Sequence, residues 1–507
     1  MSAGTAAVTE HRSNLGDLFN DRRAGDSRCL TEIGADGSVR HHTLAECHDT
    51  ADAVARGLIA RGLEPGARIA IAAANGARFL LAFLGIMRAG FCAVPVNFRL
   101  GPAAREHVFR DSGVVLALAD ADRTAMVPEG TPILRLDDDA QWDALCRPGP
   151  FTPQPMAPRD FANILYTSGS TGRPKGVPIT HGGFLYALHG AGAAMPQPWD
   201  ARVLVAAPLY HMNALFWTEL ALLSGASVVL MSGFDARAYL TAAAEERCTH
   251  LSGVPTMIAL ALRETDLLER LDLSCVQAIN VGSAPLSAEM MGEFRRAFPA
   301  AAISNGYGTT ESGPLAFRPH PDGRPTPWPS LGVASDRVEL RLVGGPSADE
   351  GTLWVRSPVV TPGYLNLPEK TAERIRDGWY DTGDVMRRDG EGFYYFVGRA
   401  DDMFTCGGEN VYPGEVEALL EAHPAIAQAA VVPVPDRIKG NLPAAFVVPS
   451  PGAALDADMV KAHALAHGPA YQHPRFVVIV EALPLSGTNK IDRKPLAEQA
   501  ATFIRDI

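Results

Sequence analysis

The sequence predicts an α/β protein, because apolar strands alternate with amphipathic helices over most of its length. Residues 43–62 have a helical pattern, residues 67–74 (ARIAIAAA) form a buried strand, and residues 77–90 are helical again before the strand FCAVPVN. Strands and helices in this order build parallel sheets that are flanked by helices. At 507 residues the chain is long enough for more than one domain.

The same alternation returns between residues 202 and 282. Apolar segments of strand length are separated there by longer helical segments with their own start signals. The expected strands are RVLVAAPL, SVVLM, HLSGV and VQAINVG, and the expected helices lie near 213–223, from Asp235 and after Pro255. This second run again indicates a parallel sheet.

After about residue 330 the pattern changes to short strands and turns. VELRLVGG, GTLWVRS and GFYYFVGR favour a smaller, mostly antiparallel unit that closes the large domain. Downstream of GRADD (398–402) the chain has a helix, several strands and a final helix of its own. We therefore expect an N-terminal domain over residues 1–400 and a C-terminal domain over residues 401–507.

Composition argues against several classes of protein. The net charge is -12 and no Lys/Arg block stands out, which disfavours a nucleic-acid partner or an anionic membrane surface. The seven cysteines are scattered and never form a CxxC pair, so neither a disulfide framework nor a zinc knuckle is expected. The N-terminus has no apolar signal region, and Glu219, Ser224 and Gly225 interrupt the apolar stretch 214–231. These features predict a cytoplasmic protein without a membrane span.

One loop combines glycine, serine and threonine directly after an apolar strand. Residues 166–176 read YTSGSTGRPKG, and Lys175 lies at the end of the run. Backbone N–H groups and hydroxyls in such a loop approach phosphate oxygens closely, and the lysine supplies a cation. The loop is not a Walker A motif, because Pro174 precedes Lys175 and Gly176 follows it. Taken alone, the loop also fits a surface turn, so other motifs must distinguish a phosphate-binding loop from a turn.

Two further motifs carry groups that suit a nucleotide. NGYGTTES (305–312) contains Tyr307, an aromatic ring that can stack on a base, and Glu311, a hard oxygen ligand for Mg2+. DGWYDTGD (377–384) ends in Asp384, whose carboxylate can accept two ribose hydroxyls.

Three more segments lie in the last quarter of the chain. The dipeptide GR at 398–399 adds the fixed cation Arg399. CGGENVYPGEVE (406–417) is a Gly-rich turn that opens a helix, and SGTNKIDRKPL (486–496) presents Lys490 on a loop. Together with the loop of residues 166–176, these five further motifs favour a phosphate-binding enzyme over a simple surface turn.

In order and spacing, these motifs resemble the adenylate-forming superfamily of acyl-CoA synthetases, adenylation domains of peptide synthetases and luciferases. The matching segments span residues 67–496, and the chain looks most like an AMP-forming acyl- or aryl-CoA ligase. The resemblance implies a large N-terminal domain of two stacked α/β sheets plus a β-barrel, followed by a small mobile α+β lid. It also implies ATP, Mg2+ and coenzyme A as cofactors or co-substrates. A carboxylate would attack MgATP to give an acyl-adenylate, and a thiol would then displace AMP.

The resemblance also implies a role for each matched position. In the triphosphate loop these are Thr167, Ser168, Gly169, Ser170, Thr171, Gly172 and Lys175. The adenine site and the turn beside the α-phosphate comprise Gly282, Ser283, Ala284, Asn305, Gly306, Tyr307, Gly308, Thr309 and Thr310. Asp384 and Arg399 match the ribose contacts, while Glu311 and Thr167 match the metal site.

In the C-terminal domain, Lys490 matches the lysine that bridges the acyl carboxylate and the phosphate, whereas Lys494 is interpreted as a surface residue. Asp402 matches the hinge about which the lid rotates between the two steps, the behaviour called domain alternation. Gly407 and Gly408 match the lining of a pantetheine channel, although an ordinary helix start also fits them.

Two arginines are further candidates. Arg88 and Arg475 either meet the phosphates of the CoA nucleotide or are simply solvated.

PLYHMNALF (208–216) occupies the position of the acyl pocket. His211 either gates the carboxylate or belongs to the rim of the core. The expected pocket residues are His211, Met212, Asn213, Val254, Ala284, Gly306, Gly308 and Gly313. No basic side chain is among them, so a second carboxylate on the acid is disfavoured because it would be buried unpaired. One amide in an apolar cavity favours an aromatic acid of the benzoate or hydroxycinnamate type.

Two alternatives stay open at this point. One is a medium- or long-chain fatty acyl-CoA synthetase, and the other is a stand-alone adenylation enzyme that loads a carrier protein. An amino-acid-selecting enzyme usually has an aspartate for the ammonium group, and Asp235 lies nearby in the sequence. The expected partners are a small carboxylic acid, ATP and CoA, with a homodimer as an open possibility.

Overall fold

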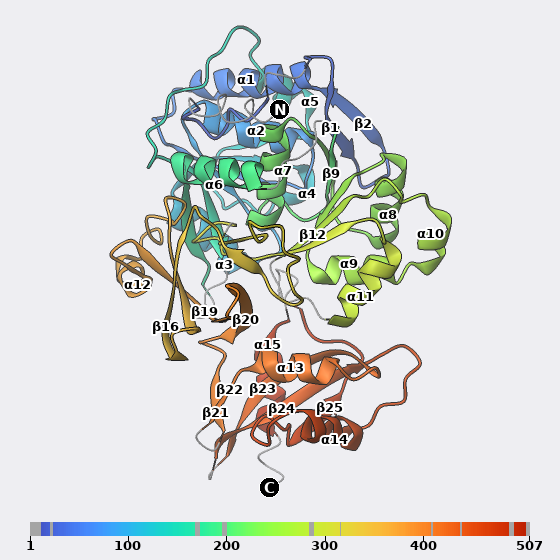
Figure 1. The fold of residues 1–507 in the computed structure, drawn as a ribbon. Coiled ribbons are helices and arrows are strands. Elements are labelled where there is room, and N and C mark those ends of the chain that lie inside the picture. Colours follow the sequence, from blue (N-terminus) through green and yellow to red (C-terminus); the bar gives the residue numbers. More distant parts are fainter. Residues whose placement is uncertain are drawn as a thin grey trace.

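A computed structural model describes residues 12–20, 24–167, 173–194, 200–282, 288–314, 316–406, 409–436, 439–485 and 491–502. In these residues the strands form four sheets, here called sheets I to IV. Figure 1 shows the part that contains sheet IV and helices α13 to α15 below the larger remainder of the molecule.

Sheet I is mainly parallel and follows the second predicted alternation. Only the β1–β2 pair at its edge is antiparallel among the described strands. In spatial order the strands are β13 (Ala302–Gly306), β12 (Ala278–Gly282), β11 (His250–Gly253), β9 (Arg202–Val205), β10 (Ser227–Met231), β1 (Arg28–Ile33) and β2 (Val39–Thr43). The parallel sheet expected between residues 202 and 282 is therefore present.

Sheet II follows the first predicted alternation. Its spatial order is β6 (Ile133–Arg135), β5 (Val114–Ala119), β3 (Arg68–Ala72), β4 (Cys92–Pro95), β7 (Phe161–Thr167) and β8 (Lys175–Thr180). Strands β7 and β8 pair antiparallel with Thr167 opposite Lys175, whereas the other pairs are parallel. The loop of residues 166–176 therefore joins two strands of a hairpin and brings both of its ends to one edge of the sheet.

Helices cover sheets I and II, and one apolar core includes residues of both sheets, such as Leu30, Val203, Ile71 and Leu165. The helices are α1 (Leu44–Ile59), α2 (Ala77–Arg88), α3 (Pro102–Ser112), α4 (Ala121–Thr124), α5 (Asp139–Leu145), α6 (His181–Ala194), α7 (Met212–Ser224), α8 (Ala236–Glu245), α9 (Pro255–Leu262), α10 (Thr265–Arg270) and α11 (Ala288–Ala297). The shared core explains why the two sheets stack as a single large unit.

Sheet III is the mostly antiparallel unit predicted after residue 330. Its order is β14 (Phe317–Arg318), β15 (Gly332–Ala334), β20 (Phe393–Arg399), β19 (Trp379–Arg388), β17 (Glu350–Arg356) and β16 (Glu339–Ser347), with β18 (Ile375–Arg376) paired to β19. Helix α12 (Pro368–Arg374) precedes β18. Sheet III matters for the site because it places Asp384 directly opposite Arg399 on neighbouring strands.

Sheet IV belongs to the C-terminal part. It contains β22 (Glu409–Val411), β21 (Phe404–Cys406), β24 (Gly440–Pro449), β23 (Ile426–Asp436) and, parallel to β24, β25 (Phe476–Ile479). Helices α13 (Pro413–Glu421), α14 (Ala457–His467) and α15 (Arg493–Ala500) accompany it. The chain passes from sheet III to sheet IV between residues 399 and 404, next to the predicted hinge.

Arg88 corrects one sequence expectation, because its side chain is fully buried. The guanidinium pairs with Asp52, donates from Nε to the carbonyl oxygen of Gly16 at 2.9 Å, and lies 5.2 Å from the ring centroid of Phe19. Both members of the Arg88–Asp52 pair are shielded from water. Arg88 is therefore a core residue, and both interpretations that the sequence left open, contact with a CoA phosphate and simple solvation, are wrong.

Replacing Arg88 by methionine should destabilise the large domain without changing CoA recognition. The substitution leaves Asp52 buried without its cation, and breaking a buried pair costs about 3–5 kcal/mol. We expect a clear fall in the midpoint of thermal unfolding followed by circular dichroism, with an unchanged KM for CoA. The control Arg388→Met removes an exposed pair with Asp349, whose loss costs about 0–1 kcal/mol. An unchanged midpoint with a raised KM for CoA would contradict the core assignment.

Candidate functional site

The candidate site forms where the β7–β8 hairpin, the turn after β13 and sheet III meet. The hydroxyl of Thr361 donates to the carbonyl oxygen of Pro178 at 2.8 Å, and its backbone N–H donates to the carbonyl oxygen of Glu311 at 2.8 Å. The N–H of Leu365 donates to the carbonyl oxygen of Gly176 at 2.9 Å. Segment 361–365 therefore fastens the end of the hairpin to the turn that carries Glu311.

Two predicted residues meet at the carboxylate of Asp384, which is buried. Nη1 of Arg399 donates to Oδ1 at 2.7 Å, and the hydroxyl of Tyr307 donates to Oδ2. Burial and the neighbouring Asp384 raise the pKa of Tyr307, so the phenol stays a donor. Burial opposes the charge on Arg399, but Asp384 and Asp401 outweigh it and raise the pKa of that guanidinium. The structure thus joins residues that lie 77 positions apart in the chain.

A second cluster surrounds Glu311, which is also buried. The hydroxyl of Tyr364 donates to Oε1 of Glu311 at 2.9 Å, and Nζ of Lys175 lies 4.6 Å from the centroid of the same ring. Burial lowers the pKa of Lys175, Glu311 opposes that shift, and Arg374 and other nearby cations add to it. Lys175 and Glu311 therefore belong to one site, as the motifs predicted.

Other predicted positions lie near the ends of strands β7, β12 and β13 and in the turn after β13. In the described residues, Oγ1 of Thr167 is buried without a hydrogen-bond partner. Gly282 pairs with Gly306 across the parallel strands β12 and β13, and Asn305 pairs with Val281. Oγ1 of Thr309 lies 2.9 Å from Oγ of Ser312, whereas Thr310 follows it in the same turn. The ends of β12 and β13 thus lie side by side.

Two of the predicted pocket glycines have a backbone reason. Gly313 has φ of +73° and a Cβ there would lie 2.5 Å from Cγ2 of Val359. A Cβ on Gly308 would lie 2.6 Å from the carbonyl oxygen of Gly313. These glycines permit the bridged turn Thr309–Gly313, whereas Gly306 has room for a Cβ, whose nearest neighbour would lie at 3.6 Å.

The predicted acyl-pocket segment also reaches this edge. His211 is the N-cap residue of α7 and its ring lies 4.6 Å from the ring of Tyr210, centroid to centroid. Nδ2 of Asn213 lies 3.2 Å from the position of a Cβ on Gly282. Met212 and Val254 pack against the main core from its margin. The start of α7 therefore lies beside the end of β12.

Several predicted positions lie outside the described residues. They are Ser168, Gly169, Ser170, Thr171, Gly172, Ser283, Ala284, Gly407, Gly408 and Lys490. Their roles stay predictions. Arg475 and Lys494 are both exposed, which agrees with the surface position expected for Lys494. Contact of Arg475 with a CoA phosphate stays a prediction.

Asp235 has a structural role that the sequence left open. Its side chain accepts from the N–H of Ala238 at 2.9 Å and caps α8. A capping carboxylate stabilises the start of its helix. Asp235, which was considered for recognition of an ammonium group, therefore uses its carboxylate to cap a helix.

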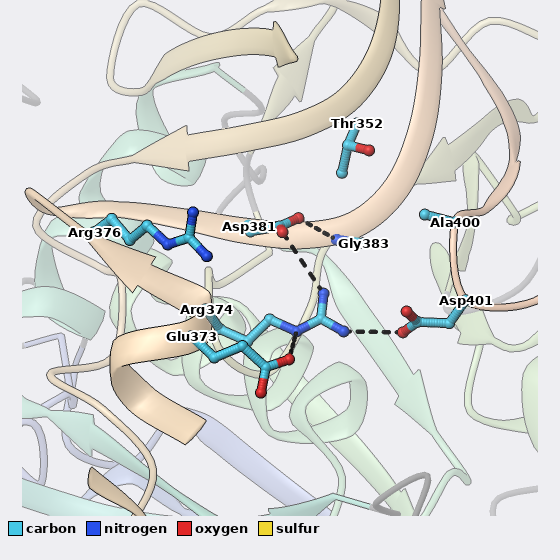
Figure 2. Close-up of a pocket in the computed structure, with 8 residues that line it drawn as sticks. All are labelled: Thr352, Glu373, Arg374, Arg376, Asp381, Gly383, Ala400 and Asp401. Atoms are coloured by element: carbon cyan, nitrogen blue, oxygen red, sulfur yellow. Dashed lines mark hydrogen bonds and ion pairs between the residues drawn. The ribbon is translucent and has the colours of Figure 1, made fainter. Parts of the chain in front are cut away.

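Sequence reasoning missed a charged pocket next to the predicted hinge. Figure 2 shows Arg374 at its centre, with Asp381, Glu373 and Asp401 around the guanidinium. Nη2 of Arg374 lies 3.0 Å from Oδ2 of Asp401, and Nη1 lies 3.8 Å from Asp381. Asp401 also pairs with Arg399 at 3.4 Å. Arg374 belongs to none of the predicted motifs. Its position shortly before DGWYDTGD was the one sequence feature that could have indicated a place in the site.

The predicted hinge residue Asp402 has a different set of contacts. Its backbone N–H donates to the carbonyl oxygen of Arg399 at 3.2 Å, while the ion pairs are made by Asp401. The role of Asp402 as a hinge stays a prediction.

Comparison with known proteins identifies the enzyme family to which the chain belongs. Residues 20–365 match the AMP-binding enzyme family and residues 415–490 match the AMP-binding enzyme C-terminal domain. The chain belongs to this family of adenylate-forming enzymes, which confirms the resemblance seen in the motifs and the predicted fold class.

Individual relatives indicate which kind of adenylate-forming enzyme the chain resembles. The chain is 36% identical to a feruloyl-CoA synthase from Amycolatopsis sp over 491 residues, which covers 93% of this chain and 96% of the relative. ATP-bound MatB from Rhodopseudomonas palustris superimposes with a TM-score of 0.87 at 28% identity, covering 97% and 99% of the two chains. The anthranilate CoA ligase AuaEII with anthranoyl-AMP also gives 0.87, at 25% identity and 97% and 98% coverage. These similarities confirm the prediction of an acid–thiol ligase.

In the described residues, no helix has the length and apolar character needed to cross a bilayer. This agrees with the expectation from the interrupted stretch 214–231.

Asp384→Asn tests the cluster around the predicted ribose site. Asparagine keeps the size of the side chain but loses the charge, and hydrogen bonds to charged groups contribute about 1.5–3 kcal/mol. We expect the Kd for ATP, measured calorimetrically, to rise at least about tenfold. The wild type should also discriminate against 2′,3′-dideoxyATP, and the variant should not.

The matched control is Asp389→Asn, because Asp389 accepts from the hydroxyl of Tyr395 at 2.8 Å near the turn of the β19–β20 hairpin, which also carries Asp384. It should leave ATP affinity unchanged. Equal discrimination against the dideoxy nucleotide in wild type and Asp384→Asn would rule out a ribose contact at Asp384.

Proposed function

We propose that this chain is an AMP-forming CoA ligase for an aromatic carboxylic acid of the hydroxycinnamate or benzoate type. The observation that carries the proposal is the convergence of Lys175, Glu311, Asp384 and Arg399 from separate motifs on one edge of the large domain. Feruloyl-CoA synthase and an anthranilate CoA ligase are among its relatives, and both names denote aromatic acyl groups. These names support the choice of an aromatic acid.

In the first step, a carboxylate oxygen of the acid attacks the α-phosphorus of ATP. A new O–P bond forms, the bond to the β-phosphate oxygen breaks, and pyrophosphate leaves. Lys175 and the triphosphate loop hold the β- and γ-phosphates, while Asp384 and Arg399 fix the ribose. Lys490 bridges the carboxylate and the α-phosphate, and Thr310 lies beside it. Fixed positive charge lowers the cost of bringing an anion against a polyanion.

Glu311 and Thr167 suit a bound Mg2+. One oxygen of Glu311 accepts from Tyr364, and the described residues give its second oxygen no hydrogen-bond partner. Oγ1 of Thr167 is likewise buried without a partner there. Mg2+ usually binds through one or two protein oxygens plus substrate phosphates, which this donor set fits. When bound, the ion neutralises charge on the phosphates.

In the second step, the thiol of CoA attacks the acyl carbonyl carbon. A C–S bond forms, the C–O bond to the phosphate breaks, and AMP leaves with that oxygen. We propose that residues 401–507 act as a lid that turns near Asp402 between the steps. The lid then withdraws Lys490 and brings Gly407 and Gly408 to the pantetheine channel. His211, Met212, Asn213 and Val254 would enclose the acyl group.

The cellular setting follows from the same proposal. The seven cysteines are free thiols, which fits the reducing conditions of the cytoplasm. A homodimer stays a prediction.

A panel of acids tests the substrate. Pyrophosphate release with MgATP and CoA should be fastest, in kcat/KM, with ferulate, 4-coumarate or benzoate. A thioester should form with free CoA, which excludes dependence on a carrier protein. A series of C6 to C12 fatty acids that exceeds all aromatic acids by tenfold would contradict the aromatic assignment.

Lys490→Ala tests the division of labour between the two steps. Adenylation, followed as ATP–pyrophosphate exchange, should be lost because the bridging cation is gone. Thioester formation from supplied acyl-adenylate should persist within a few-fold. Lys494→Ala, four residues further on, is the matched control and should retain both activities. Equal loss of both steps in Lys490→Ala would contradict the lid mechanism.

A further inference from the structure

Tyr364 lies between the two opposite charges of the phosphate site. Its hydroxyl donates to Oε1 of Glu311 at 2.9 Å, and its ring faces Nζ of Lys175 at 4.6 Å from the centroid. No motif singled this residue out. One side chain therefore contacts both the carboxylate and the ammonium group.

Lys175 and Glu311 attract each other but do not form an ion pair. Glu311 is close enough to oppose the burial effect on the pKa of Lys175, yet the described residues give Lys175 no carboxylate oxygen within 4.0 Å. In a partly dry site, such a pair would form readily if nothing separated it. The ring of Tyr364 offers the ammonium a cation–π contact in its place.

Tyr364 is itself firmly held. Its side chain is buried, and its backbone N–H donates to Oγ1 of Thr371 at 2.9 Å. The next residue, Leu365, donates to the carbonyl oxygen of Gly176, the neighbour of Lys175. Burial and the adjacent Glu311 raise the pKa of Tyr364, so its hydroxyl remains a proton donor. The backbone N–H groups of Tyr364 and Leu365 thus hold this segment, and the ring with it, in place.

We propose that Tyr364 is a positioning residue that keeps the metal-binding carboxylate of Glu311 and the phosphate-binding ammonium of Lys175 apart before ATP binds. Its hydroxyl orients Glu311 with one oxygen directed to the metal, and its ring holds Lys175 available for the phosphates. The inference rests on the proposed function of these two residues. It implies that the two contributions of Tyr364 can be separated by substitution.

Two variants separate them. Tyr364→Phe removes only the hydroxyl and keeps the ring beneath Lys175. Tyr364→Leu removes the ring as well and allows Lys175 to pair with Glu311, a pair that ATP must then break. We would measure ATP binding by calorimetry in EDTA, which reports the phosphate contacts, and Mn2+ binding to the enzyme–ATP complex by electron paramagnetic resonance.

Tyr364→Phe should bind ATP in EDTA within twofold of the wild type but bind Mn2+ about tenfold more weakly, as expected for one lost hydrogen bond to a charged group. Tyr364→Leu should weaken both, with ATP in EDTA weakened about tenfold. Tyr395→Phe is the matched control, because it removes a partly buried phenol–carboxylate hydrogen bond to Asp389, and it should change neither value.

Some results would overturn the inference. If Tyr364→Phe weakens ATP in EDTA and Mn2+ equally, the residue only supports the fold. If Tyr364→Leu behaves like Tyr364→Phe, the ring does not hold Lys175. A wild type that binds no ATP would instead overturn the proposed function, so the two failures are distinguishable.

Discussion

The whole site depends on holding fixed charges of both signs close together in a buried setting. Asp384 pairs directly with Arg399, whereas Lys175 and Glu311 lie near each other without an ion pair among the described residues. Adenylation brings a carboxylate against a triphosphate, so positive charge must be waiting for both. Under the proposed function, Glu311 would hold a metal ion and Asp384 would contact the ribose. Buried phenols contribute to this arrangement, because the hydroxyls of Tyr364 and Tyr307 each donate to one carboxylate oxygen without adding charge. The other oxygen of Asp384 accepts from Arg399.

The fold makes this arrangement possible through strand register. The β7–β8 hairpin sets Lys175 opposite Thr167, and sheet III sets Asp384 opposite Arg399. Neighbouring residues on paired strands have their Cβ atoms about 4.5–5.5 Å apart, which suits ion pairs and hydrogen bonds. Backbone pairing thus places Lys175, Asp384 and Arg399. Glu311 lies in a turn instead, and the hydrogen bonds of Thr361 link that turn to the hairpin.

Much of this was accessible from the sequence. Hydrophobic alternation predicted sheets I and II, because buried parallel strands are continuous apolar runs. Motifs predicted Lys175, Glu311, Asp384 and Arg399, because phosphate, metal and ribose each require particular side-chain chemistry. The position of each charge relative to the others could not be predicted, since it depends on register between distant strands.

Tertiary contacts explain the residues that sequence reasoning missed. Arg88 lies at the end of an amphipathic helix, where arginines are usually exposed, yet Asp52 and Gly16 meet it in the core. Tyr364 and Arg374 acquire their neighbours only when sheet III packs beside the hairpin and the chain crosses toward sheet IV.

The most direct test of this account traces the carboxylate oxygen atoms of the acid into the products. An aromatic acid labelled with 18O in both carboxylate oxygens would be converted with MgATP and CoA, and the products would be examined by mass spectrometry. Attack at the α-phosphorus predicts AMP that carries one 18O atom, together with unlabelled pyrophosphate. Unlabelled AMP, or ADP with 18O in orthophosphate, would show that the acid is not activated as an adenylate and would contradict the account.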